Sequence, residues 1–347
     1  MTTEGAVSPV TRRTLIGALL TGGLVSACSR ATGSTAASAT SSSAAGASSA
    51  AAADASTMAA TSPSRPAAPS ARAAALPTTH AWTARPGEVS PSVKRVATSL
   101  IETLGTWSHG QGDVASARSR LAHAGYDPAL AGELAPLLGV GTDSVVSVRD
   151  AQYGGILSST ASVLVVVDQW RLTSDGTVHA GGTTVDVRLE QASPHWRVTA
   201  VHPATPGLPT SSLTRSARAV LSDSRIHLPH AAHADVAAGR IHDTVLGLLL
   251  AMAQQHVVDV SVLRSGHPLD VFGTSRPSDH PKGRAVDVWA LDGKPLVLHA
   301  NHTLAASAMR FAAAHGAYNV GGPVLLSGSG YFSDRTHQDH IHLGYNH

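Results

Sequence analysis

The residues best suited to metal chemistry lie in two short segments near the C-terminal end of the sequence. The first, Ser278 to Asp287, has the spacing S-x-H-x-x-G-x-A-x-D, and the second, Asp339 to His342, reads both D-x-x-H and H-x-H. Together they offer two imidazoles and one carboxylate as ligands. A catalytic zinc typically has three protein ligands and an open fourth position. We therefore predict a catalytic zinc site built from both segments.

The residue types and spacing favour this site on chemical grounds. Neutral imidazole and carboxylate are good zinc donors, and a mixed set leaves enough residual charge on the metal to acidify water. Gly283 allows the loop between His280 and Asp287 to turn back sharply, so that both side chains can face one metal. If a strand includes His340 and His342, both side chains lie on the same face of it.

The segment from Ser278 to Asp287 resembles the signature of zinc metallopeptidases that include D-alanyl-D-alanine carboxypeptidases, L-alanyl-D-glutamate endopeptidases and the Hedgehog signalling domain. The closing segment is similar to the final element of that superfamily, and the resemblance covers roughly residues 235–347. It implies that His280, Asp287 and His342 bind Zn²⁺. The alternative is chance, since the chain has 20 histidines, but two spaced elements in the family's order are difficult to obtain by accident.

The resemblance also implies roles for the neighbouring residues. Asp339 has the spacing of the general base, and His340 that of the H-x-H partner, so we expect Asp339 to be the base and His340 to stabilise the transition state or act as an alternative base. Many members have a Ser-Gly-Tyr-Arg turn whose arginine binds substrate, whereas this chain has Arg264-Ser-Gly-His-Pro268. Arg264 or Arg276 could bind substrate instead, and the alternative for each is an ordinary surface charge.

The first 27 residues are predicted to be an export signal. Arg12 and Arg13 form a twin-arginine pair, an apolar stretch follows, and Cys28 stands where a bacterial lipoprotein signal has its lipidated cysteine. An ordinary cleaved signal with an incidental cysteine is the alternative. The apolar stretch is far shorter than the ~20 residues that span a bilayer. We therefore expect a lipid anchor on the extracytoplasmic face of the membrane.

Composition limits the remaining possibilities. Residues 28–86 are rich in alanine, serine and threonine, which predicts a disordered tether. The net charge of +2 gives no broad basic field, so a nucleic-acid partner is not expected. One cysteine excludes a disulfide within the chain. The alanine, histidine, arginine and glycine content is typical of actinobacterial proteins.

Two α+β domains are predicted to follow the tether. The first, residues 87–207, reads as two helices followed by four strands, and this order is similar to nuclear-transport-factor-like or cystatin-like folds. The expected helices are 93–104 and 113–124, and the expected strands are 144–149, 161–172, 183–191 and 196–203. Its histidines and aspartates are scattered, so no site is expected there. We interpret it as an accessory domain for spacing, docking or inhibition.

The second domain, residues 208–347, is predicted to be the zinc domain. Its expected helices are 235–255, with Asp235 as the N-cap, and 303–315. Its expected strands are 257–263, 285–290 and 340–345. Asp287 lies on the second of these strands and His342 on the third.

The predicted function is a lipid-anchored zinc peptidase that cuts D-amino-acid-containing bonds in peptidoglycan stem peptides. The alternative is an inactive, zinc-stabilised domain that binds wall peptides or a protein partner. Intact Asp339 and His340 favour the enzyme, and the altered arginine turn favours the binding domain. A third interpretation gives the function to residues 87–207, as a scaffold in an envelope complex.

Overall fold

The first half of the described chain is built on an antiparallel four-stranded sheet. The computed structural model describes residues 75–139 and 142–347. The strands pair in chain order: β1 (Asp143–Ile156), β2 (Thr160–Leu172), β3 (Val178–Gln191) and β4 (Trp196–Pro203). All four predicted strands are confirmed, and β1 and β3 are longer than expected. We call residues 75–207 the N-terminal half and residues 208–347 the C-terminal half.

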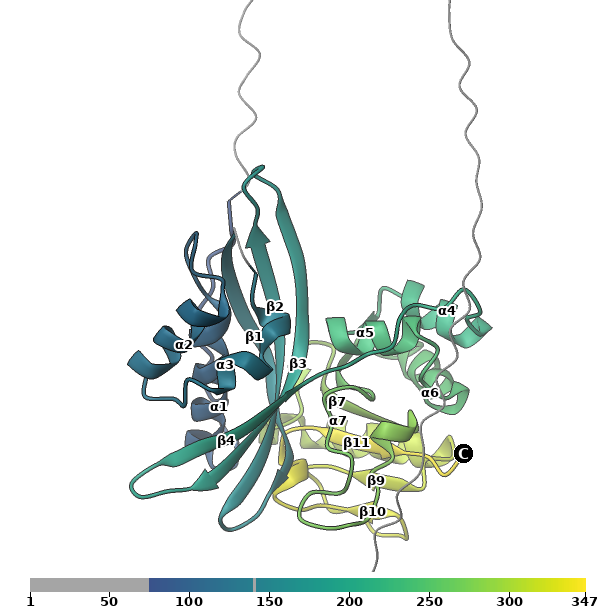
Figure 1. Cartoon of the computed structure of the whole chain (residues 1–347). Coiled ribbons are helices and arrows are strands. Elements are labelled where there is room, and N and C mark those ends of the chain that lie inside the picture. Colours follow the sequence, from purple (N-terminus) through teal and green to yellow (C-terminus); the bar gives the residue numbers. More distant parts are fainter. Residues whose placement is uncertain (1–74, 140–141) are drawn as a thin grey trace, which may run out of the picture. The chain divides into compact units, whose positions relative to one another are not determined.

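Three helices cover one face of this sheet (Figure 1). They are α1 (Pro91–Gly105), α2 (Val114–His123) and the short α3 (Leu130–Glu133). The apolar residues of α1 recur every three or four positions, so they share one face and are buried against the sheet. Asp113 caps α2 by accepting hydrogen bonds from two backbone N–H groups of its first turn. Both predicted helices are therefore confirmed.

A second, seven-stranded sheet forms the centre of the C-terminal half. Its order is β10-β9-β11-β7-β6-β5, with β8 beside β7. The strands are β5 (Ile226–His227), β6 (Val258–Val262), β7 (Ala285–Leu291), β8 (Lys294–Pro295), β9 (Asn319–Gly321), β10 (Tyr331–Phe332) and β11 (Ile341–Gly344). β7 and β11 are antiparallel neighbours, and His342 lies opposite Asp287. This pairing brings the two motif segments together.

The C-terminal half has four α-helices, and one prediction about them is wrong. They are α4 (Arg215–Ser222), α5 (His230–Ala237), α6 (Asp243–Ala253) and α7 (His302–Ala314). The single helix expected over 235–255 is divided into α5 and α6 by Gly239, whose φ is 65°. Asp235 does not cap a helix start. It is buried near the end of α5, where it accepts a 2.7 Å hydrogen bond from the backbone N–H of Ser265.

The ordered chain begins before residue 87. The backbone N–H of Trp82 donates to Glu102 Oε1 at 2.6 Å, and Arg85 pairs with the buried Asp150 at 2.8 Å. A large aromatic residue packed against the core and a paired arginine are incompatible with a free tether up to residue 86. The predicted signal, Cys28 and most of the predicted tether lie outside the described residues.

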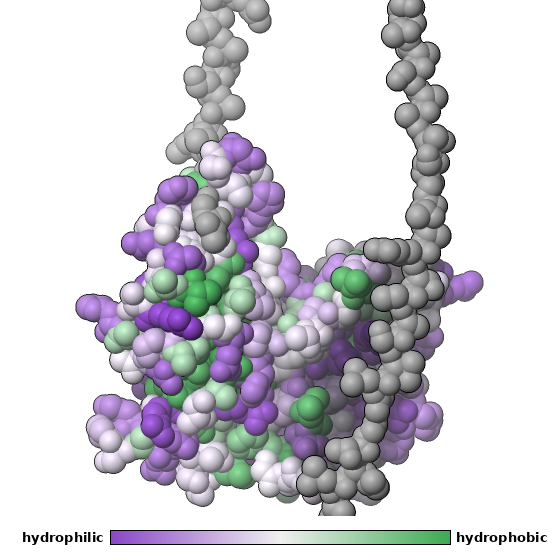
Figure 2. Space-filling view, in the orientation of Figure 1, coloured by the Kyte–Doolittle hydropathy of each residue, from purple (hydrophilic) through white to green (hydrophobic). Residues whose placement is uncertain are grey.

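The fold class is α+β, with two mainly antiparallel sheets and two separate hydrophobic clusters, one in each half. The described residues belong to one compact unit. On the face shown in Figure 2, hydrophilic residues predominate and hydrophobic residues form separate areas among them. Among the helices of residues 75–139 and 142–347, none has the length and apolar character needed to span a bilayer.

Candidate metal centre

Three donor atoms from the two predicted segments converge at the junction of β7 and β11. His280 Nε2 lies 3.2 Å from Asp287 Oδ1 and 3.1 Å from His342 Nδ1, and His342 Nδ1 lies 3.0 Å from Asp287 Oδ1. All three side chains are buried. Two donors on one tetrahedral zinc, each with a bond of about 2.05 Å, are roughly 3.3 Å apart. The spacing therefore fits three ligands of one ion.

The outer contacts of two of these residues leave the converging atoms free for a metal. His280 Nδ1 donates to the backbone carbonyl of Leu263 at 2.5 Å, so Nε2 carries no proton in the neutral ring. Asp287 Oδ2 accepts a 2.6 Å hydrogen bond from Gln152 Nε2, which leaves Oδ1 facing the two imidazoles. A ring N–H on a carbonyl and a hydrogen-bonded carboxylate are typical surroundings of metal ligands.

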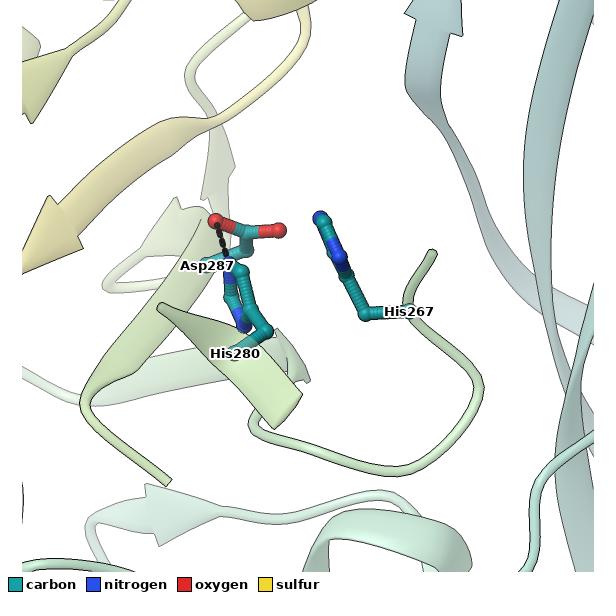
Figure 3. Close-up of side chains that lie close together, drawn as sticks. All are labelled: His267, His280 and Asp287. Atoms are coloured by element: carbon teal, nitrogen blue, oxygen red, sulfur yellow. Dashed lines mark hydrogen bonds and ion pairs between the residues drawn. The ribbon is translucent and has the colours of Figure 1, made fainter. Parts of the chain in front are cut away.

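A third histidine, which sequence reasoning missed as a ligand, adjoins these residues. His267, His280 and Asp287 form a group that could hold a metal ion (Figure 3). The His267 ring stacks on that of His280 with centroids 4.0 Å apart, and its Nδ1 lies 2.9 Å from the carbonyl of Pro268. Burial and the neighbouring His280 hold the pKa of His267 well below its usual value, so the ring is a neutral donor. Its one sequence signal is its place in the turn before the motif.

Gly283 has the conformation that the motif predicted. Its φ is 71°, and a Cβ added there would lie 2.1 Å from the backbone oxygen of Arg240. We expect Gly283→Ala to lower the free energy of unfolding by about 1–3 kcal/mol through backbone strain, with a further loss from the clash. Gly293→Ala is the matched control, because Gly293 has a φ of 67° with open space around it. Equal losses in urea unfolding would show that the contact with Arg240 is unimportant.

Asp339 and His340 form a hydrogen-bonded pair beside the converging atoms. His340 Nδ1 lies 2.5 Å from Asp339 Oδ1, and His340 Nε2 lies 3.7 Å from Asp287 Oδ1. The histidine therefore lies between Asp339 and the candidate metal position. This arrangement differs from the expected one, in which Asp339 itself faces the reacting atoms.

The other oxygen of Asp339 is occupied by the N-terminal half. Asp339 Oδ2 lies 2.6 Å from Lys94 Nζ and accepts a 3.1 Å hydrogen bond from the backbone N–H of Tyr153. Burial alone would raise the pKa of Asp339, but Lys94 and His340 lower it to about 2. Burial would likewise lower the pKa of His340, but Asp287 and Asp339 raise it to about 9. Both net shifts come from the opposite charges around these groups, and they favour an anionic Asp339 beside a protonated His340.

Lys94 is completely buried and also pairs with Glu88. Burial raises the pKa of Glu88 to about 7 against the opposing charge of Lys94. Because this value is above the ordinary 4.5, the folded state retains a proton that the unfolded state has released. The stability from this group is complete below about pH 4.5 and is lost as the pH rises through about 7.

We therefore expect Glu88→Gln to reduce the fall in the free energy of unfolding between pH 5 and pH 8. The glutamine has no proton to lose over this range, so its contribution is constant. Urea unfolding of both proteins at intervals of pH measures the difference. Parallel pH profiles for wild type and variant would contradict the assignment of this titration to Glu88.

A cavity of about 500 Å³ opens onto the candidate metal centre, and both halves line it. The end of β1 and the residues after it contribute Tyr153 to Leu157, and the C-terminal half contributes His267, His340 and His342 among others. Residues 87–207, in which the sequence predicted no site, therefore form part of the wall of this cavity. The lining residues of this half come from the end of β1 and the turn after it, and none of its scattered histidines and aspartates is among them.

The structure brings only one of the two predicted substrate arginines to the cavity. Arg276 lines it, and so does Arg335, which the sequence did not single out. Arg264 does not line it: its Nε donates to the carbonyl of Pro281 at 3.2 Å, and its Nη1 lies 3.9 Å from Asp235. Arg264 therefore braces the turn before the motif.

Comparison of the chain with family models, curated proteins and solved structures found no significant match.

Proposed function

We propose that the chain is a zinc-dependent peptidase whose metal ligands are His280, Asp287 and His342. The convergence of their three donor atoms within 3.0–3.2 Å of one another supports this most strongly. Two imidazoles and one carboxylate suit zinc better than magnesium or calcium, which prefer oxygen ligands. Zinc held by three protein ligands supplies a Lewis acid that polarises a carbonyl and acidifies water.

In this proposal His340 transfers the proton, and Asp339 orients the His340 ring. The hydrogen bond of Nδ1 to Asp339 directs Nε2 of His340 toward the centre, where the neutral form of the ring can accept a proton from the attacking water. A cation bound beside Nε2 would favour that neutral form. The same nitrogen can return the proton to the departing amine. Asp339 keeps the imidazole in one orientation and stabilises its protonated form, as the carboxylate does in other Asp–His pairs.

We propose peptidoglycan stem peptides as the substrate, cut at bonds that contain D-amino acids. Arg276 and Arg335 at the cavity supply positive charge for a peptide carboxylate. Lipidation at Cys28 would hold the protein on the extracytoplasmic face of the membrane, within reach of the wall.

The test is metal content and hydrolysis of purified peptidoglycan by the full-length chain. About one zinc per chain and release of peptides support the proposal, and activity lost on chelation should return with added zinc. His299→Ala is the control variant, because His299 is exposed and does not line the cavity. Zinc bound without cleavage of any wall substrate would favour the binding domain instead. A wild-type chain without zinc would overturn the metal site.

A further inference from the structure

We propose that the N-terminal half is an integral part of the metal centre, with Gln152 and Lys94 as positioning residues for the metal ligand Asp287 and the proton-handling pair of Asp339 and His340. This inference rests on the proposed function. It assigns the N-terminal half a role in chemistry that occurs on residues of the C-terminal half.

Gln152 fixes the orientation of Asp287. Its Nε2 donates to Asp287 Oδ2 at 2.6 Å, and its Oε1 accepts a hydrogen bond from the hydroxyl of Ser261. Ser261 in turn lies 3.2 Å from the backbone carbonyl of Asp287. Gln152 and Ser261 are fully buried, so these hydrogen bonds have no competing water. The amide therefore holds one carboxylate oxygen and leaves the other for the metal.

Lys94 fixes the orientation of Asp339. Its ammonium group is 2.6 Å from Asp339 Oδ2, and Tyr153 supplies a backbone N–H to the same oxygen. With both donors on Oδ2, Oδ1 remains for the Nδ1 of His340. A fully buried lysine is costly unless it is paired. The burial of Lys94 therefore requires the carboxylate of Asp339, and the orientation of Asp339 requires Lys94.

The edge position of β1 explains how the N-terminal half reaches the centre. β1 is the outer strand of its sheet, and its pairing with β2 is irregular between Tyr153 and Gly155. An edge strand has backbone donors that its own sheet does not use. Two of them serve the C-terminal half: Tyr153 donates to Asp339, and Ile156 donates to Thr336 Oγ1 at 3.3 Å. Alternation along the strand turns Gln152 toward Asp287 and the Tyr153 ring toward the core of its own half.

Gln152→Met is the first test, because methionine has a similar length and lacks the amide donor. We expect zinc affinity, measured by chelator competition on the full-length chain, to fall by about 10- to 100-fold. Gln169→Met is the matched control: Gln169 is buried in the same sheet and donates to the backbone of Leu137 and to Ser144. It should lower the unfolding temperature of the metal-free protein without changing zinc affinity.

Lys94→Met is the second test, and its expected effect is different. Zinc affinity should stay within about 3-fold of wild type, while kcat should fall by about 10- to 100-fold, because Asp339 loses the cation that orients it. A purely structural role would alter folding stability without separating zinc affinity from kcat. Loss of zinc affinity in Gln152→Met and loss of kcat at nearly unchanged zinc affinity in Lys94→Met would therefore identify two positioning residues.

Two outcomes would overturn the inference. If Gln152→Met and Gln169→Met both bind zinc as tightly as wild type, and wild type is an active zinc enzyme, the proposed function stands and the role of Gln152 does not. If wild type binds no zinc, both proposals fail. Should Gln152→Met not fold, Ser261→Ala replaces it, since it removes the hydroxyl on Gln152 Oε1 and should weaken zinc binding in the same direction.

Discussion

Replacing His280 with alanine is expected to abolish zinc binding and hydrolysis together. His280 Nε2 lies 3.1 Å from His342 Nδ1 and 3.2 Å from Asp287 Oδ1, so it is one of the three converging donor atoms. A chain that retains two ligands should lose more affinity than the roughly 10- to 100-fold that follows loss of an outer hydrogen-bond partner. The variant also leaves the carbonyl of Leu263 without its buried donor, which costs about 1–3 kcal/mol of stability. Metal analysis and a peptidoglycan assay on the same preparation measure both effects.

The histidine variants also decide which third ligand completes the site. If His280, Asp287 and His342 hold the metal, His342→Ala should lose zinc as His280→Ala does, and His267→Ala should retain it. The opposite pattern would select the group of His267, His280 and Asp287. His299→Ala should match wild type in both measurements, which excludes a general effect of removing a histidine.

Replacing His340 with alanine is expected to lower kcat by about 10²- to 10⁴-fold while zinc remains bound. His340 Nε2 faces the centre but lies 3.7 Å from Asp287 Oδ1, farther than the three converging atoms lie from one another. In the proposed mechanism it is therefore placed to move a proton and is not one of the metal ligands. The measurement is single-turnover cleavage with zinc content determined in parallel.

Asp339→Asn distinguishes the two possible bases. If His340 is the base and Asp339 its orienting partner, the amide should cost less activity than His340→Ala, because Nδ1 can still donate to the amide oxygen. If Asp339 is the base, as its spacing predicts, the amide should cost at least as much. The ion pair with Lys94 at 2.6 Å and the pKa of about 2 favour the orienting role.

Local sequence was sufficient to predict most of the helices and strands and to select the residues that converge in the candidate metal centre. The valine-rich strands and the three-to-four-residue period of α1 can be recognised within one segment, because each pattern reflects only which face of that segment is buried. The motif spacing depends on a turn at Gly283 and on alternation in β7 and β11, which are also local. The helix expected over 235–255 was wrong because Gly239, with a φ of 65°, ends α5, and the backbone N–H of His242 donates to Gly283 before α6 begins. The contact with Gly283 joins distant segments, so it leaves no mark in a helical period.

The sequence by itself determined which residue types could hold a metal, their spacing and the α+β class of the chain. Only the tertiary structure decided what surrounds them: Gln152 on Asp287, Lys94 on Asp339 and His267 against His280. Each of these contacts joins segments that are separated in the sequence, and their geometry depends on how the edge of β1 and the loop after β6 pack. The packing of distant elements leaves no periodic pattern in the sequence. The partner of a buried charged residue can therefore be identified only from the folded structure.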